Sequence, residues 1–180
     1  MKYDVIPNQM VLDTPRLVLR PPRTSDAGLM SFYAGDRRVA EMTRDIPHPL
    51  PPGASEAFIA RALKGDRVDD VWVMDGSANG LSELLGVVSL ARMEGGQSAI
   101  GYWVGPAFWN TGIASEAVQA IVQENPLDNR TIFAEVFQDN PSSAKVLTHA
   151  GFEYIGDAEG FSVARGATVK TWTYLRRMDI

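Results

Sequence analysis

Cysteine is absent from this chain of 180 residues, and histidine occurs only at His48 and His149. Without thiols the chain can form no disulfide, no thiolate-ligated zinc or iron–sulfur site and no cysteine-linked intermediate. Two histidines are also too few for the usual histidine-rich metal sites. We therefore expect chemistry that uses neither a metal ion nor a thiol nucleophile.

Long apolar runs and an excess of positive charge are missing as well. No stretch approaches the roughly 20 apolar residues of a membrane span, and residues 1–7 lack the apolar segment of a secretory signal. The formal net charge of −5 argues against nucleic acid as the main partner. The sequence predicts a cytoplasmic protein that binds neither membrane nor nucleic acid, and it leaves monomer and homodimer open.

The remaining composition, 45% hydrophobic and 22% charged, is that of an ordinary globular protein, and no repeat or linker divides it. A single domain over residues 1–180 is expected. Strands are expected at 16–20, 71–74, 84–90, 99–104, 131–137, 152–155 with an extension toward 163, and 168–175. Helices are expected after the capping cluster Thr24, Ser25 and Asp26, after the cap Ser55, over 114–124, and from Pro141 to Gly151. This order predicts an α/β fold, a mixed sheet of about seven strands with helices on both faces.

The segment from 100 to 117 reads as a strand, a short loop and a helix. Asn110 and Gly112 tolerate left-handed backbone angles, so successive N–H groups can converge in the loop. The helix N-terminus adds partial positive charge, which suits a pyrophosphate. The same residues could form a plain strand-to-helix turn without a ligand, because neither common phosphate-binding fingerprint is present.

This segment, from Tyr102 to Ala117, resembles the acetyl-CoA-binding motif of the GNAT family of N-acetyltransferases, whose end matches Gly112-x-Ala114. Within the family it is similar to the ribosomal-protein alanine acetyltransferase branch, where a Trp often stands at the place of Trp109. Other segments match that branch in order, namely Leu12 to Arg20, Ile46 to Pro49, Asn140-x-x-Ser143, and Gly151-Phe152. The resemblance implies direct transfer of an acetyl group from acetyl-CoA to a primary amine in a ternary complex, without a metal.

The resemblance also implies a set of residues that bind acetyl-CoA. They are Trp103, Val104, Asn110, Thr111, Gly112, Ile113, Ala114, Ser115, Asn140 and Ser143. In the family the residue matching Asn140 bonds the pantetheine arm, and the hydroxyl matching Ser143 contacts the thioester sulfur. From the residues alone, Asn140 could instead cap the helix that starts at Pro141, and Ser143 could satisfy a backbone N–H.

Two departures from the branch affect the expected site. Thr111 stands where Lys or Arg is common, so one basic phosphate contact is expected to be missing. Leu147 stands where other branches often hold a catalytic Tyr, so the role of stabilising the departing thiolate passes to Ser143.

The acceptor side is less defined by the sequence. Glu159 is the candidate base, and His48 and Arg165 are candidates for binding the acceptor; bracing a loop and lying solvated in a hairpin are the alternatives. At pH 7, deprotonating an α-amine costs about 1.4 kcal/mol and a lysine about 4.6 kcal/mol. A small-molecule amine or a protein N-terminal α-amine is therefore expected as acceptor. The alternative function is a catalytically silent CoA-binding or regulatory module of the same fold.

Overall fold

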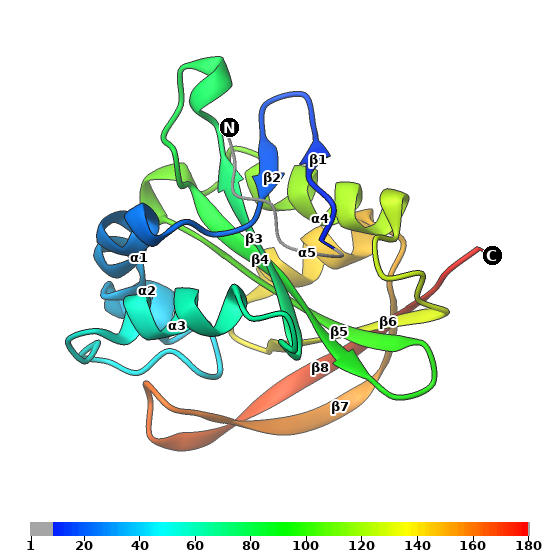
Figure 1. Cartoon of the computed structure of the whole chain (residues 1–180). Helices are drawn as coiled ribbons and strands as arrows, with labels where there is room; N and C mark the ends of the chain where they lie inside the picture. The colour runs from blue at the N-terminus through cyan, green and yellow to red at the C-terminus, as the bar shows by residue number, and fades with distance from the viewer. Residues whose placement is uncertain (1–8, 180) are drawn as a thin grey trace.

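The computed structural model describes residues 9–179, in which eight strands form one mixed sheet in the order β1-β2-β3-β4-β5-β6-β8-β7 (Figure 1). The strands are β1 (Leu12–Asp13), β2 (Val18–Arg20), β3 (Asp69–Asp75), β4 (Gly86–Met93), β5 (Gln97–Val104), β6 (Thr131–Phe137), β7 (Glu153–Ser162) and β8 (Ala167–Arg177). Neighbouring strands are antiparallel except β5 and β6, which are parallel. The mixed sheet is confirmed, with one more strand than the seven expected, because the two-residue β1 is too short to show a periodic pattern.

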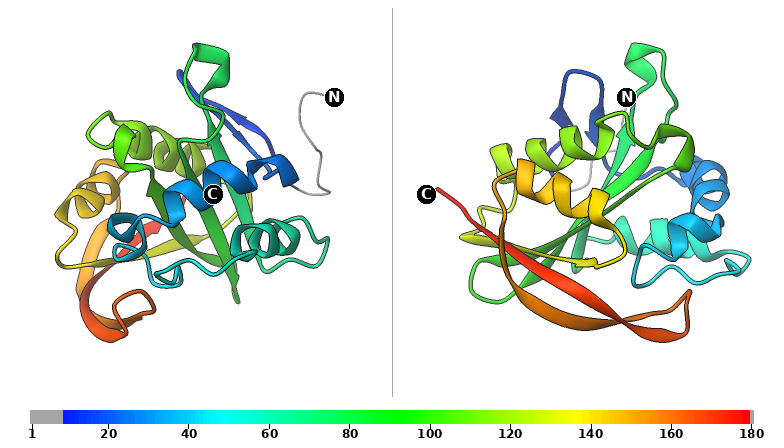
Figure 2. Two further views of the ribbon diagram at one scale, coloured as in Figure 1. Left: turned by 90° about the vertical axis from the view of Figure 1, so that its left-hand side faces the viewer. Right: turned by 180° about the vertical axis from the view of Figure 1, so that it is seen from behind.

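Helices cover both faces of this sheet, as predicted (Figure 2). They are α1 (Ala27–Ala34), α2 (Arg37–Ala40), α3 (Ala54–Ala62), α4 (Ile113–Glu124) and α5 (Pro141–His149). Alternate side chains of β3 enter two different cores: Trp72 packs in the cluster with α4 and α5, and Val73 in the cluster with α1 and α3. No helix in the described range 9–179 is long and apolar enough to cross a membrane.

Of the two predicted helix caps, Ser55 was wrong and the cluster ending at Asp26 was right in position. Ser55 lies inside α3, where its hydroxyl accepts a 2.7 Å hydrogen bond from Ser31, and Gly53 occupies the N-cap position with a φ of 79°. Asp26 occupies the N-cap position of α1 but makes no side-chain capping bond to that helix, and its carboxylate instead accepts two hydrogen bonds of 2.9 Å from Arg20. The fully buried Arg20 guanidinium needs carboxylate partners, and this need determines the orientation of Asp26.

The parallel strands β5 and β6 separate at their carboxyl ends. They pair only from Gln97↔Thr131 to Ala99↔Phe133, although β5 continues to Val104 and β6 to Phe137. Beyond that point β5 stays paired with β4, and β6 stays paired with β8. The sheet is therefore open between residues 100–104 and 134–137. Because α4 follows β5 and α5 follows β6, both helices begin near this opening, which is where α/β sheets bind ligands.

Candidate active site

The loop before α4 has the backbone conformation that the sequence predicts. Asn110 has a φ of 61° and Gly112 a φ of 80°, both in the left-handed region. The Trp109 indole N–H donates to the Val104 carbonyl over 2.7 Å, and the Thr111 hydroxyl donates to the Phe108 carbonyl. The first N–H groups of the 12-residue α4 have no partner within the helix, so the exposed loop is a suitable anion site.

A cation from the N-terminal part of the chain lies against this loop. Arg16 donates from Nη1 to the Thr111 carbonyl over 2.9 Å and from Nε to Glu116 Oε1 over 2.8 Å. Thr14 and the Arg16 backbone N–H donate to the other Glu116 oxygen over 2.6 and 2.8 Å. Partial burial alone would raise the pKa of Glu116, but these hydrogen bonds outweigh it and hold the pKa below its usual value.

The other residues expected in the acetyl-CoA site differ in how far their side chains are exposed to solvent. Val104 and Ile113 are buried, and Trp103 packs on the α1 and α3 side of the sheet, away from α4. These three can offer a ligand at the opening little beyond backbone groups. Ala114 and Ser115 are half-buried in the first turn of α4, and the Ser115 hydroxyl accepts a 3.1 Å hydrogen bond from Gln119.

Ser143 forms a reciprocal pair with Tyr102, a residue that the sequence did not indicate. The Ser143 hydroxyl donates to the Tyr102 hydroxyl over 2.8 Å, and the Tyr102 hydroxyl donates to the Ser143 carbonyl over 2.8 Å. Burial raises the pKa of Tyr102 well above its usual value, so the phenol stays protonated. The pair joins β5 to the first turn of α5. Ser143 therefore does not satisfy a backbone N–H, and Asn140 makes no side-chain capping bond to α5.

Glu135 is the second residue that the sequence analysis missed. It lies on β6 beyond the last pair with β5, on the face opposite the buried Ile132 and Ala134. Arg44 approaches one carboxylate oxygen, Nη1 to Oε2, at 3.3 Å. The other oxygen, Oε1, is buried and has no hydrogen-bond partner among the described residues. An unpaired buried carboxylate oxygen is costly, which makes Glu135 a candidate for contact with a polar group outside the chain.

Gly160 packs closely against Glu135, and any side chain there would crowd the carboxylate. A Cβ at Gly160 would lie 2.8 Å from Glu135 Oε1. The Thr171 hydroxyl, whose methyl group lies on the same side of Gly160, is likewise buried without a partner in the described structure. A lone glutamate between Ala134 and Val136 was the available sequence signal, and strand periodicity alone treats it as an ordinary outward residue.

Glu159 lies on the edge strand β7 with an exposed side chain, opposite Lys170 of β8. It borders a shallow hollow of about 230 Å³ together with Gln138 and Asp157. Successive strand residues face opposite sides, and Gly160 faces Glu135, so Glu159 points away from Glu135. Its role as the base stays a prediction, and the geometry offers Glu135 as a second candidate.

The two residues expected at the acceptor are held in different ways. Arg165 donates from Nε and Nη2 to the Glu41 carbonyl over 2.9 and 2.7 Å, and from Nη1 and Nη2 to Asp139 over 2.6 and 3.1 Å. It thereby ties the β7–β8 turn to the segment after α2 and to the β6–α5 loop. His48 lies half-buried in the proline-rich loop, and its Nδ1 has no partner within the described range. Acceptor binding by either residue stays a prediction.

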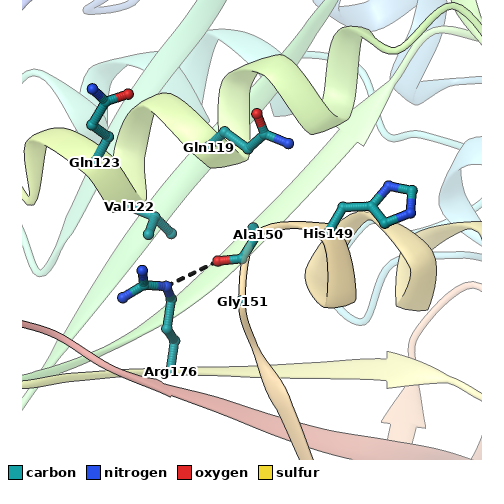
Figure 3. Close-up of a pocket in the computed structure, with 7 residues that line it drawn as sticks. All are labelled: Gln119, Val122, Gln123, His149, Ala150, Gly151 and Arg176. Atoms are coloured by element: carbon teal, nitrogen blue, oxygen red, sulfur yellow. Dashed lines mark hydrogen bonds between the residues drawn. The ribbon is translucent and has the colours of Figure 1, made fainter.

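A larger hollow, of about 370 Å³, lies at the other end of α4 and α5 (Figure 3). Its lining residues are Gln119, Val122, Gln123, His149, Ala150, Gly151 and Arg176. Arg176 points at the end of α5, where its Nε donates to the Ala150 carbonyl over 2.9 Å. This hollow is remote from the helix N-termini and from the opening in the sheet, so its size does not make it the active site. Within residues 9–179 no group of three His, Asp or Glu side chains is placed to hold a metal ion.

Comparison with known proteins agrees with this geometry. The family model described as "Acetyltransferase (GNAT) domain" matches residues 16–153. An uncharacterized N-acetyltransferase, p20, from Bacillus licheniformis is 26% identical over 174 residues, covering 91% of this chain and 93% of that protein.

Among solved structures, the microcin C7 self-immunity acetyltransferase MccE, in complex with acetyl-CoA and AMP, superposes with a TM-score of 0.79 at 17% identity, covering 91% of this chain and 93% of that one. The ribosomal-protein-S5-alanine acetyltransferase from Vibrio fischeri gives a TM-score of 0.74 at 20% identity, covering 95% and 98%. At these identities the two structures establish the fold alone. The family model, which matches most of the chain, establishes more: this protein belongs to the GNAT family of acetyltransferases.

Proposed function

We propose that this enzyme transfers an acetyl group from acetyl-CoA to a primary amine, with both substrates bound in the opening between β5 and β6. One observation carries this proposal. The opening has the N-terminus of α4, which suits an anion, on one face of the sheet and a carboxylate with an unpartnered buried oxygen, Glu135, on the other. A donor and an acceptor that enter from opposite faces would meet between the separated strands.

The residues present fit acetyl-CoA. The N–H groups at the start of α4 suit its diphosphate. Residues 100–104 have no strand partner on the side of β6, so their backbone groups can pair with the amides of the pantetheine arm as a strand would. The Asn140 side chain, which makes no capping bond, is free to bond the same arm. Acetyl-CoA supplies the activated acetyl group when bound.

The acceptor amine must be neutral to attack, and we propose Glu135 as the group that takes its proton. The new amide bond forms as the thioester C–S bond breaks, and the departing thiolate needs a hydrogen-bond donor. Ser143, supported by Tyr102, is the proposed donor. A positioned acid or base of this kind contributes typically 10²- to 10⁴-fold to the rate.

An α-amine is the acceptor best matched to this single carboxylate. Its lower pKa makes the neutral form about 10²-fold more abundant at neutral pH than that of a lysine side chain. The Vibrio fischeri relative is named as an alanine acetyltransferase of a ribosomal protein, and other GNAT proteins of this fold are named for small molecules such as spermidine. We therefore propose a polypeptide N-terminus or a small amine as acceptor. A cytoplasmic location and a monomeric or homodimeric state remain proposals.

Calorimetric titration with acetyl-CoA, followed by a thiol-release assay over a panel of amines, tests this function. The panel contains short peptides with free N-termini, the same peptides with acetylated N-termini as controls, polyamines and free lysine. We expect saturable binding and turnover with at least one free amine. Binding without turnover on any amine would instead support the catalytically silent module, and absence of binding would overturn the donor assignment.

A further inference from the structure

The helix that would receive the diphosphate carries no positive charge of its own. Between Arg92 and Arg130 the sequence contains no Lys or Arg, and α4 itself contributes Glu116 and Glu124. Backbone N–H groups and the helix dipole supply only partial charges. A full positive charge beside these N–H groups would bind a doubly charged diphosphate more tightly, and the fold brings one there from another part of the chain.

Arg16 lies over the first turn of α4. Two of its three guanidinium nitrogens are fixed, Nε by Glu116 and Nη1 by the Thr111 carbonyl. The third, Nη2, lies 3.3 Å from the place where a Cβ on Gly112 would stand. No acceptor is bonded to Nη2 in the part of the chain that the structure describes, and the side chain is 41% exposed. The free N–H groups of Nη2 therefore lie beside the free N–H groups of the helix.

We propose that Arg16 binds the diphosphate of acetyl-CoA, supplying the charge that Thr111 and the rest of the loop lack. This inference rests on the proposed acetyl-CoA site. A guanidinium suits the role because it keeps its charge at all relevant pH values and presents several donors in one plane. The hydrogen bonds from Nε and Nη1 fix the position of the guanidinium, and the N–H groups of Nη2 are left for the anion.

Glu116 positions Arg16 and offsets part of its charge, but from the side of the guanidinium away from Gly112. The carboxylate is occupied by three donors, from Thr14, the Arg16 backbone and Arg16 Nε. These contacts place Glu116 on the Nε side of the guanidinium, whereas Nη2 lies at Gly112. Removing the charge of Glu116 should therefore leave the affinity for an anion unchanged or raise it, but removing that of Arg16 should lower it.

Arg38 is another cation near the loop. Its guanidinium carbon lies 5.7 Å from the centre of the Trp109 ring, and its Nη2 is paired with Asp36 at 2.8 Å. Asp36 accepts from both Nε and Nη2 of Arg38, whereas Nη2 of Arg16 lies at Gly112, so we assign the diphosphate contact to Arg16.

Calorimetric titration of CoA and of pantetheine, which lacks phosphate, tests the assignment on wild type, Arg16→Gln, Arg16→Lys, Glu116→Gln, Arg38→Gln and Arg130→Gln. The loss of a charged hydrogen bond should weaken CoA binding by about 10-fold or more in Arg16→Gln, with pantetheine binding unchanged. Arg16→Lys should recover most of this loss. Arg130→Gln, which removes the same charge at the amino end of β6, away from the opening, should stay within about 2-fold of wild type.

The outcomes separate the two proposals. If wild type binds CoA and Arg16→Gln binds it equally well, the assignment of Arg16 is wrong and the function stands. An equal loss in Glu116→Gln and Arg16→Gln would show that the ion pair acts only on the structure of the loop, and a loss confined to Arg38→Gln would move the contact to Arg38. If circular dichroism shows that Arg16→Gln is unfolded, the assignment of Arg16 is tested instead by the ratio of CoA to pantetheine affinity in Arg16→Lys and Glu116→Gln. If wild type does not bind CoA, the proposed function itself fails.

Discussion

The hydroxyl groups of Tyr102 and Ser143 lie 2.8 Å apart and join β5 to α5 across the opening in the sheet. The donor of Ser143 is thus directed at Tyr102, and that of Tyr102 at the Ser143 carbonyl. For Ser143 to donate to a departing thiolate, its hydroxyl must rotate away from Tyr102, which can remain bonded to the carbonyl. Leu147, fully buried in the core, leaves α5 with no tyrosine for this role.

We therefore predict that Ser143 and Tyr102 act as a unit. Ser143→Ala and Tyr102→Phe should each lower kcat and kcat/KM together by about 10-fold or more, with acetyl-CoA affinity within about 2-fold of wild type. The double variant should be little worse than either single one, because both remove the same function. Steady-state kinetics and calorimetry on the folded variants measure this. A near-normal kcat for Ser143→Ala would assign the leaving-group role to another donor.

A second prediction compares the two candidate bases. Glu135→Gln keeps the shape of the side chain but removes its ability to take a proton, so kcat should fall by about 100-fold. Glu159→Gln is the matched control, since Glu159 is exposed on the opposite face of the sheet, and its kcat should change by less than about 2-fold. Thiol-release rates at saturating acetyl-CoA distinguish the two. The reverse pattern would restore Glu159 as the base.

Much of the framework could be predicted from local patterns. Alternation and β-branched residues identify β6, Pro141 marks the start of α5, and Asn110 with Gly112 indicates the left-handed loop before α4. These features depend on a few neighbouring residues, so a single sequence carries their signal. Family membership could be anticipated for the same reason, because the motif is continuous.

The contacts that build the site could not be predicted, because they join distant segments. Arg16 meets Glu116 across 100 positions, Arg44 meets Glu135 across 91, and Tyr102 meets Ser143 across 41. Each pairing depends on the order of strands in the sheet and on where β5 and β6 separate. Helix α2 was missed for another reason: its four residues are too few to show a period.

A third prediction concerns the left-handed residue at the start of α4. Gly112→Ala adds a Cβ at a φ of 80° and 3.3 Å from Arg16 Nη2, so it should lower the free energy of unfolding by about 1–2 kcal/mol and weaken CoA binding. Gly80→Ala is the control, because Gly80 has a φ of 75° but nothing within 4 Å of the added Cβ. It should cost similar stability and leave CoA binding intact. Equal CoA affinity in both variants would contradict the placement of the diphosphate at Gly112.

The last prediction concerns acid stability. Burial opposes the ionisation of Asp75, but hydrogen bonds from Arg20 and Ser77 outweigh it and lower the pKa of Asp75 below its usual value. A carboxyl group whose pKa is lower in the folded protein stabilises the fold at pH values above its unfolded pKa, and this stabilisation is lost as the pH falls through the folded pKa. The free energy of unfolding should therefore be level above about pH 5, the plateau, and decrease below about pH 4, the acid limb.

Asp75→Asn should lower the free energy of unfolding on the plateau by about 1–3 kcal/mol, because Arg20 loses one of its two buried carboxylates. It should also make the decrease along the acid limb less steep. Asp36→Asn, at an exposed pair with Arg38 whose cap an Asn can also form, should change the plateau by less than about 0.5 kcal/mol. Urea unfolding at a series of pH values measures both variants, and an acid limb in Asp75→Asn as steep as in wild type would show that other carboxylates control the acid transition.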